Sequence, residues 1–105
     1  MTPIDLGRYK GIYLKTAKEY INSMFLSCDK LAINASDKEA INNLHISSHS
    51  LKSQSQVMGF ADVADLCLNI EKTSDDASKG IIQLNNENIL DIKKKVDELD
   101  GILHS

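Results

Sequence analysis

Apolar side chains recur every three or four positions along most of the chain, which is the spacing of one face of an α-helix. Four stretches show this pattern, at about residues 4–32, 37–58, 61–78 and 86–103. The apolar stripe of the first stretch consists of Leu6, Tyr9, Tyr13, Ala17, Tyr20, Ile21, Met24, Phe25, Cys28 and Leu31. Four amphipathic helices joined by short links predict an all-α fold, an antiparallel up-down four-helix bundle that forms one domain over residues 1–105.

Residues typical of helix ends fall in the breaks of this pattern. Ser36 and Glu39 have the spacing of a capping box, with Ser36 as the N-cap of the second helix. Gly59 is expected to close that helix, because glycine adopts the left-handed conformation without strain. Asn85 is a suitable N-cap for the fourth helix. The short apolar segment 81–84 predicts a connecting turn held against the core.

The composition narrows the class of protein. The 105 residues are 42% hydrophobic and only 5% aromatic, with no Trp, which favours an aliphatic helical core. A net charge of -3 argues against a nucleic-acid partner, which usually requires a basic patch. No apolar run has the length of a membrane span and no signal peptide opens the chain, so we expect a cytoplasmic protein or domain without a membrane partner. Cys28 and Cys67 are expected to be buried, reduced thiols.

The second predicted helix carries two polar residues at the edge of its buried face. His49 and Lys52 lie one turn apart just off the apolar stripe, and Gln56 follows one turn later. An imidazole at this margin is held by the protein and remains accessible from outside. Because a large fraction of free imidazole is neutral at neutral pH, one ring nitrogen has a lone pair available for nucleophilic attack.

Glu71 is expected to lie opposite His49. His49 precedes Gly59 by ten positions and Glu71 follows it by twelve. At about 1.5 Å per residue, two antiparallel helices place these residues at heights that differ by roughly 3 Å, less than one turn. A carboxylate hydrogen-bonded to one ring N–H would fix the tautomer and leave the other nitrogen as the nucleophile.

A family resemblance begins in the same stretch. The signature of histidine-containing phosphotransfer (HPt) domains is matched by His49-Ser50-Leu51-Lys52, the small residue Ser53 and Met58-Gly59-Phe60. Residues 13–31 resemble the first helix of the family, and residues 63–75, with Ile70-Glu71, resemble the helix after the histidine. Within this family the chain most resembles the amino-terminal phosphotransfer domains of CheA chemotaxis kinases. Those domains often have a further carboxyl-terminal helix, which would be absent or truncated here.

The resemblance implies a role in two-component signalling. His49 would accept a phosphoryl group from ATP through a CheA-type kinase domain and donate it to an aspartate of a CheY-like receiver domain. Glu71 would orient the imidazole and Lys52 would stabilise the phosphoryl charge. Supporting residues would be His45, Ser53 and Gln56, and the receiver or kinase would dock on Ile46, Val57 and Phe60. ATP and Mg²⁺ would be held by the partner domains and no cofactor by this one, since no Gly-rich phosphate loop occurs.

Several alternatives remain open at this stage. A stand-alone or hybrid-kinase HPt relay protein would use the same chemistry with a phospho-aspartate donor. A helical interaction bundle with a vestigial site is the alternative of another class, and Ser53 in place of the usual Gly keeps it open. His45 and His49 also have metal-ligand spacing, but no third ligand is evident and we expect no metal site.

Overall fold

Four α-helices make up the architecture of the computed structural model, which describes residues 6–104 apart from the side chain of Leu6. Helix α1 runs over Leu6–Ile33, α2 over Lys38–Met58, α3 over Ala61–Ser78 and α4 over Asn86–Leu103. The predicted bounds of the last two helices and the end of the second are confirmed. The predicted all-α bundle is therefore confirmed, while the predicted helical residues 4 and 5 lie outside the described residues.

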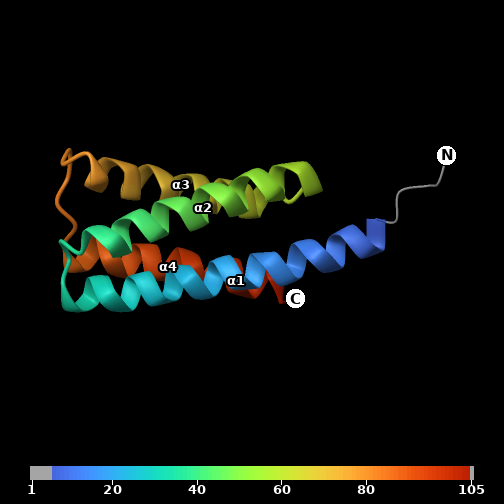
Figure 1. Ribbon diagram of the computed structural model, residues 1–105, viewed down its shortest axis with the longest axis horizontal. Coiled ribbons are helices and arrows are strands. Elements are labelled where there is room, and N and C mark those ends of the chain that lie inside the picture. Colours follow the sequence, from blue (N-terminus) through green and yellow to red (C-terminus); the bar gives the residue numbers. More distant parts are fainter. Residues whose placement is uncertain (1–5, 105) are drawn as a thin grey trace.

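The helices alternate in direction along one long axis. Figure 1 shows α2 and α3 side by side on one flank and α1 and α4 on the other, with the α1–α2 and α3–α4 connections at the same end. Helix α2 packs against both α1 and α3, and α4 packs mainly against α1. This order is the predicted up-down topology, and it leaves the α2–α3 turn at the opposite end of the molecule.

The core is aliphatic and runs the length of the bundle. Each helix contributes most of the stripe that its sequence pattern predicts, and the largest fully buried side chains include Ile21, Met24, Leu31, Leu44, Leu51, Ile70, Ile92, Leu99, Val63 and Val96. Two polar side chains of the α2 stripe, Ser48 and Ser55, are also fully buried. The Ser48 hydroxyl donates to the Leu44 carbonyl at 2.7 Å, and Ser55 forms a 2.6 Å hydrogen bond with the Tyr13 hydroxyl.

The prediction that Tyr9 belongs to the buried stripe of α1 is wrong. Its side chain is 55% exposed, whereas the next residue of that stripe, Tyr13, is buried. Figure 1 shows the reason: the first turns of α1 extend past the ends of the other helices, so no neighbour covers them. Helical spacing alone does not reveal where the covering helices stop.

The prediction that Ser36 caps α2 is also wrong. The N-cap is Asp37, whose backbone is extended and whose carboxylate accepts from the Ala40 amide at 3.1 Å. The Ser36 amide instead donates to the Asn34 side chain at 3.0 Å within the turn. The helix begins one residue later than the predicted capping box requires, so Glu39 is its second residue. Its negative charge still interacts favourably with the positive end of the helix dipole.

This cap can be tested by a matched pair of substitutions. We expect Asp37→Ala to lower the free energy of unfolding by about 1 kcal/mol, because it removes a side-chain acceptor for a helix-end N–H group. Ser36→Ala serves as the control and should change it by less than about 0.5 kcal/mol. Urea unfolding followed by circular dichroism measures both, and a larger loss for Ser36→Ala would restore the original capping box.

The remaining helix ends follow the sequence signals. Gly59 closes α2 with a φ of 80°, the left-handed conformation that favours glycine. Asn85 caps α4, and its side chain and that of Asn88 accept from each other's backbone amides in a capping box. In the α3–α4 connection, Leu84 is buried against the core, as the apolar segment 81–84 predicts.

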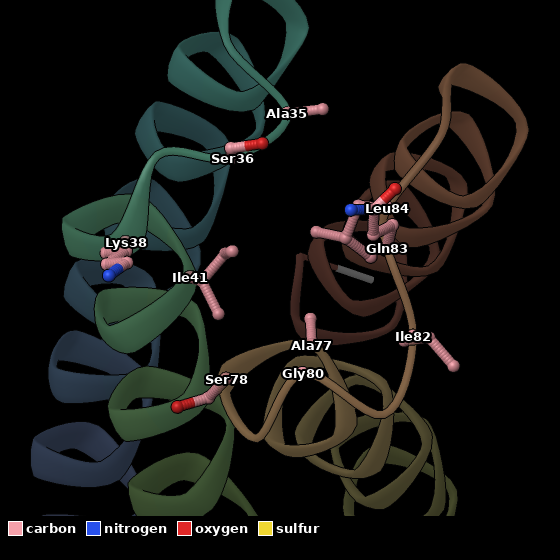
Figure 2. A pocket seen from close by; sticks show the side chains of 10 residues that line it. All are labelled: Ala35, Ser36, Lys38, Ile41, Ala77, Ser78, Gly80, Ile82, Gln83 and Leu84. Carbon is pink, nitrogen blue, oxygen red and sulfur yellow. The ribbon is translucent and has the colours of Figure 1, made fainter.

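A cavity of about 360 Å³ opens where the α1–α2 and α3–α4 connections meet. In Figure 2, Ile41 of α2 and Ala77 of α3 point into it, whereas Ile82 points away. Its lining combines these apolar side chains with loop residues such as Ser36 and Gln83. The lining does not include His49, Lys52 or Glu71, so the cavity is separate from the polar cluster described next.

Candidate functional site

Three charged or polar side chains meet between α2 and α3. His49 and Lys52 lie on α2 and each follows a buried residue, Ser48 and Leu51. Their side chains therefore lie at the edge of the buried face of α2, on the side that contacts α3. Glu71 follows the buried Ile70 on α3 and emerges from the other side of the same seam. The short turn at Gly59 makes the two helices antiparallel neighbours, which brings residues 22 positions apart into contact.

The carboxylate of Glu71 is the centre of this cluster. His49 Nδ1 lies 3.2 Å from each of its two oxygens. Lys52 Nζ lies 3.1 Å from Oε1 and 2.9 Å from Oε2. The Glu71 and Lys52 side chains are each only 17% exposed, whereas that of His49 is 56% exposed. The acid and the lysine are thus held in the seam, and the imidazole projects from it.

This arrangement selects one tautomer of His49. An ionised carboxylate can only accept hydrogen bonds, so Nδ1 must carry the proton that it donates to Glu71. In the neutral ring Nε2 is then unprotonated, and its lone pair lies on the exposed edge of the imidazole. The cluster therefore presents a nitrogen nucleophile to the solvent in a fixed orientation.

The ionised state of Glu71 is favoured by its partners. Burial by itself raises the pKa of the carboxyl, but the hydrogen bond from Lys52, that from His49 and the charges of both residues outweigh it, and the pKa lies below its usual value. Lys52 thus keeps Glu71 in the only form that can accept from His49 Nδ1 and from Lys52 together.

The lowered pKa of Glu71 predicts a dependence of stability on pH. Because the folded value lies below the unfolded value near 4.5, the ion pair stabilises the fold fully above that pH and is lost as the pH falls through the folded value. We expect the difference in free energy of unfolding between the wild type and Glu71→Gln to be constant above about pH 4.5 and to shrink as the pH falls from there toward about pH 3. Glu98→Gln, at an exposed position of α4, is the matched control. A difference that stays constant over this range would contradict the prediction.

The three predicted supporting residues lie on α2, on the turns before and after His49. The ring of His45 is parallel to that of His49, with 9° between the planes and 6.4 Å between the centroids. Ser53 is exposed, and its hydroxyl donates to the His49 carbonyl at 3.1 Å rather than to the imidazole. Gln56 is exposed one turn beyond Lys52. Ser53 and Gln56 therefore leave the approach to His49 open.

The predicted docking residues divide into two groups. Ile46 is 50% exposed and Val57 is 86% exposed, whereas Phe60 stacks on the Tyr13 ring at 5.0 Å and packs against the core. Val57 and Ser53 also line a shallow apolar groove of about 380 Å³ together with Tyr9 and Ile12 of α1. Neither α1 residue was predicted to be a surface candidate: Tyr9 was assigned to the buried stripe of the helix, and no sequence signal singled out Ile12.

The Cys67 thiol is buried and unreactive. Burial raises the pKa of the Cys67 thiol to about 12, so it stays protonated and is a poor nucleophile. Within residues 6–104, no three His, Cys, Asp or Glu side chains are grouped closely enough to hold a metal ion. None of the four described helices is long and apolar enough to cross a membrane.

Two comparisons with known proteins agree with this site and fold. The family model described as Hpt domain matches residues 8–102. Among solved structures, the chain is similar to the CheA phosphotransferase domain from Thermotoga maritima, with 26% sequence identity and a TM-score of 0.88 over 97% of this chain and 96% of that one. The chain therefore belongs to the Hpt domain family and is a histidine phosphotransfer module that resembles the phosphotransfer domain of CheA.

Proposed function

We propose that His49 is the residue that accepts and donates the phosphoryl group. The observation that supports this most strongly is the pair of 3.2 Å contacts between His49 Nδ1 and the Glu71 carboxylate, beside an imidazole edge that is open to solvent. The other described histidines are placed differently: Nδ1 of His45 is buried without a hydrogen-bond partner, and His104 pairs with Asp100, four residues earlier in the same chain segment, rather than with a carboxylate on a facing helix.

The donor is proposed to be ATP bound with Mg²⁺ to a CheA-type kinase domain. The lone pair of His49 Nε2 attacks the γ-phosphorus, the bond from that phosphorus to the bridging oxygen breaks, and ADP leaves with its electron pair. The ring becomes positively charged as the N–P bond forms, because Nδ1 still carries its proton. Glu71 stabilises that charge, since it already accepts from Nδ1.

The second half of the proposed cycle is donation to a receiver domain. An aspartate carboxylate of a CheY-like receiver attacks the phosphorus, the N–P bond breaks and its electron pair returns to Nε2. The exposed residues Ile46 and Val57 of α2 and the groove of Tyr9 and Ile12 provide apolar contacts for this partner. The small Ser53 lets the partner approach without a steric barrier.

Lys52 is proposed to act through Glu71. Two of the three ammonium N–H groups can be used by the two carboxylate oxygens, at 3.1 and 2.9 Å, which holds the acid both in place and ionised. In this role the lysine sets the tautomer of His49 without touching the phosphoryl group.

An intact-mass assay with two phosphodonors tests the proposal. The domain is incubated with ATP, Mg²⁺ and a CheA kinase core, and separately with a phosphorylated receiver. We expect one added phosphoryl group that is lost in acid and stable in base, the behaviour of a phosphoramidate. Labelling by the kinase supports the CheA-type cycle, and labelling by the receiver alone identifies a relay HPt domain. Absence of label with both donors would show that the site is vestigial.

A further inference from the structure

His45, one turn before His49, contains a buried nitrogen with no hydrogen-bond partner. The atom is Nδ1, although the residue as a whole is partly exposed. The ring lies 9° from parallel to that of His49, with the centroids 6.4 Å apart. The two imidazoles are thus nearly parallel neighbours on α2. Nδ1 of His45 is buried, and Nδ1 of His49 contacts Glu71.

The unpaired nitrogen determines where the proton of neutral His45 lies. A buried N–H group without an acceptor is rarer in folded proteins than an acceptor without a donor. The neutral tautomer that leaves no buried N–H without an acceptor therefore has a bare Nδ1 and its proton on Nε2. His45 then presents an N–H donor beside the nucleophilic lone pair that His49 presents on its own Nε2.

The charges on α3 explain why a phosphoryl group on His49 would gain from a hydrogen-bond donor on His45. Asp75 lies on α3 one turn beyond Glu71, close enough for its charge to interact with His45. Its carboxylate is paired with Lys79 at 2.9 Å, and Glu71 is paired with Lys52. A phosphoryl dianion on His49 would therefore lie near a lysine, Lys52, whose ammonium group is already paired with a carboxylate.

We propose that His45 is a phosphoryl-binding residue, whose Nε2–H donates a hydrogen bond, directly or through one water, to an oxygen of the phosphoryl group on His49. This inference rests on the proposed function and assigns a ligand-binding role to a second residue of the same surface. Hydrogen bonds to charged acceptors are stronger than neutral ones, so the bond forms only in the phosphorylated state and favours it. The neighbouring N–H therefore raises the equilibrium level of phosphohistidine.

Direct chemical phosphorylation tests this without any protein partner. The domain is equilibrated with potassium phosphoramidate, whose phosphorus passes to His49 Nε2 as its own N–P bond breaks and ammonia leaves. Intact mass gives the ratio of phosphorylated to free domain for the wild type, His45→Phe, His45→Leu and His45→Gln. Phe and Leu fill the space without a donor, whereas Gln offers an amide N–H at a similar reach. Thermal unfolding followed by circular dichroism shows which variants are folded.

We expect the equilibrium constant to fall about three- to tenfold in His45→Phe and His45→Leu, and to stay within about twofold of the wild type in His45→Gln. The rescue by Gln distinguishes a donor from a ring that only packs. Equal constants for the wild type and the folded apolar variants would overturn the role of His45 while leaving His49 as the acceptor. A Gln variant as weak as Phe would overturn it too. A wild type that takes up no phosphoryl group would overturn both proposals.

Discussion

His49→Gln abolishes phosphorylation by either donor, a loss of at least about 1,000-fold in rate. Gln fills a similar space on α2 but its amide nitrogen has no nucleophilic lone pair. The bundle should remain folded, because the His49 side chain is 56% exposed and contributes nothing to the core. Radiolabel from ATP, or added mass, measures the rate, and circular dichroism measures the fold.

A second exposed histidine provides the matched control for this experiment. His104, at the end of α4, is 52% exposed and, like His49, lies within hydrogen-bond distance of a carboxylate, here Asp100 at 2.8 Å. His104→Gln should be phosphorylated at the wild-type rate. Phosphorylation that persists in His49→Gln would show that another histidine is the acceptor. Loss of phosphorylation in His104→Gln would show that exposure and a nearby carboxylate are sufficient to make a histidine an acceptor.

Glu71→Ala slows phosphorylation by about 10- to 100-fold, the usual cost of removing the partner that orients a reactive histidine. Without the carboxylate, the neutral imidazole divides between its two tautomers, and the positive charge that forms during attack has no acceptor at Nδ1. The acceptor residue itself remains, so the final extent of labelling should change less than its rate. A time course with the kinase core separates these two quantities.

A double-mutant cycle with Lys52→Met separates the two roles available to the lysine. Met keeps most of the apolar stem and removes the charge. Because Lys52 and His49 share one carboxylate, we expect Glu71→Ala with Lys52→Met to react within about twofold of Glu71→Ala alone. Effects that multiply would show that Lys52 acts on the phosphoryl group independently of Glu71.

The sequence predicted most of the fold because the local and long-range signals agree. The apolar stripe of α2 from Ile41 to Met58 predicts a helix that ends where Gly59 adopts the left-handed conformation, and the structure has that helix end. The errors at Tyr9 and Ser36 have a different origin. Both depend on where a helix begins or ends. Tyr9 is exposed because α1 extends past its neighbours, and Asp37 rather than Ser36 is the N-cap because α2 begins one residue later than predicted.

The positions of the site residues were predictable from the sequence in part. Counting residues from Gly59 placed Glu71 within one turn of His49, and the two side chains are in contact. The sharing of that carboxylate by Lys52 was not predictable, because it depends on side-chain reach across the α2–α3 seam. The exposed groove of Tyr9 and Ile12 was missed because it requires the relative lengths of α1 and its neighbours.

The most direct test of the central proposal is to locate the phosphorus atom on the ring. The domain is labelled with ¹⁵N, phosphorylated with ATP and a CheA kinase core, and studied by long-range ¹H–¹⁵N correlation with detection of ¹⁵N–³¹P coupling. The account predicts one coupled nitrogen, Nε2 of His49, and a proton retained on Nδ1 at neutral pH. Coupling at His49 Nδ1, or at any nitrogen of His45 or His104, would contradict it.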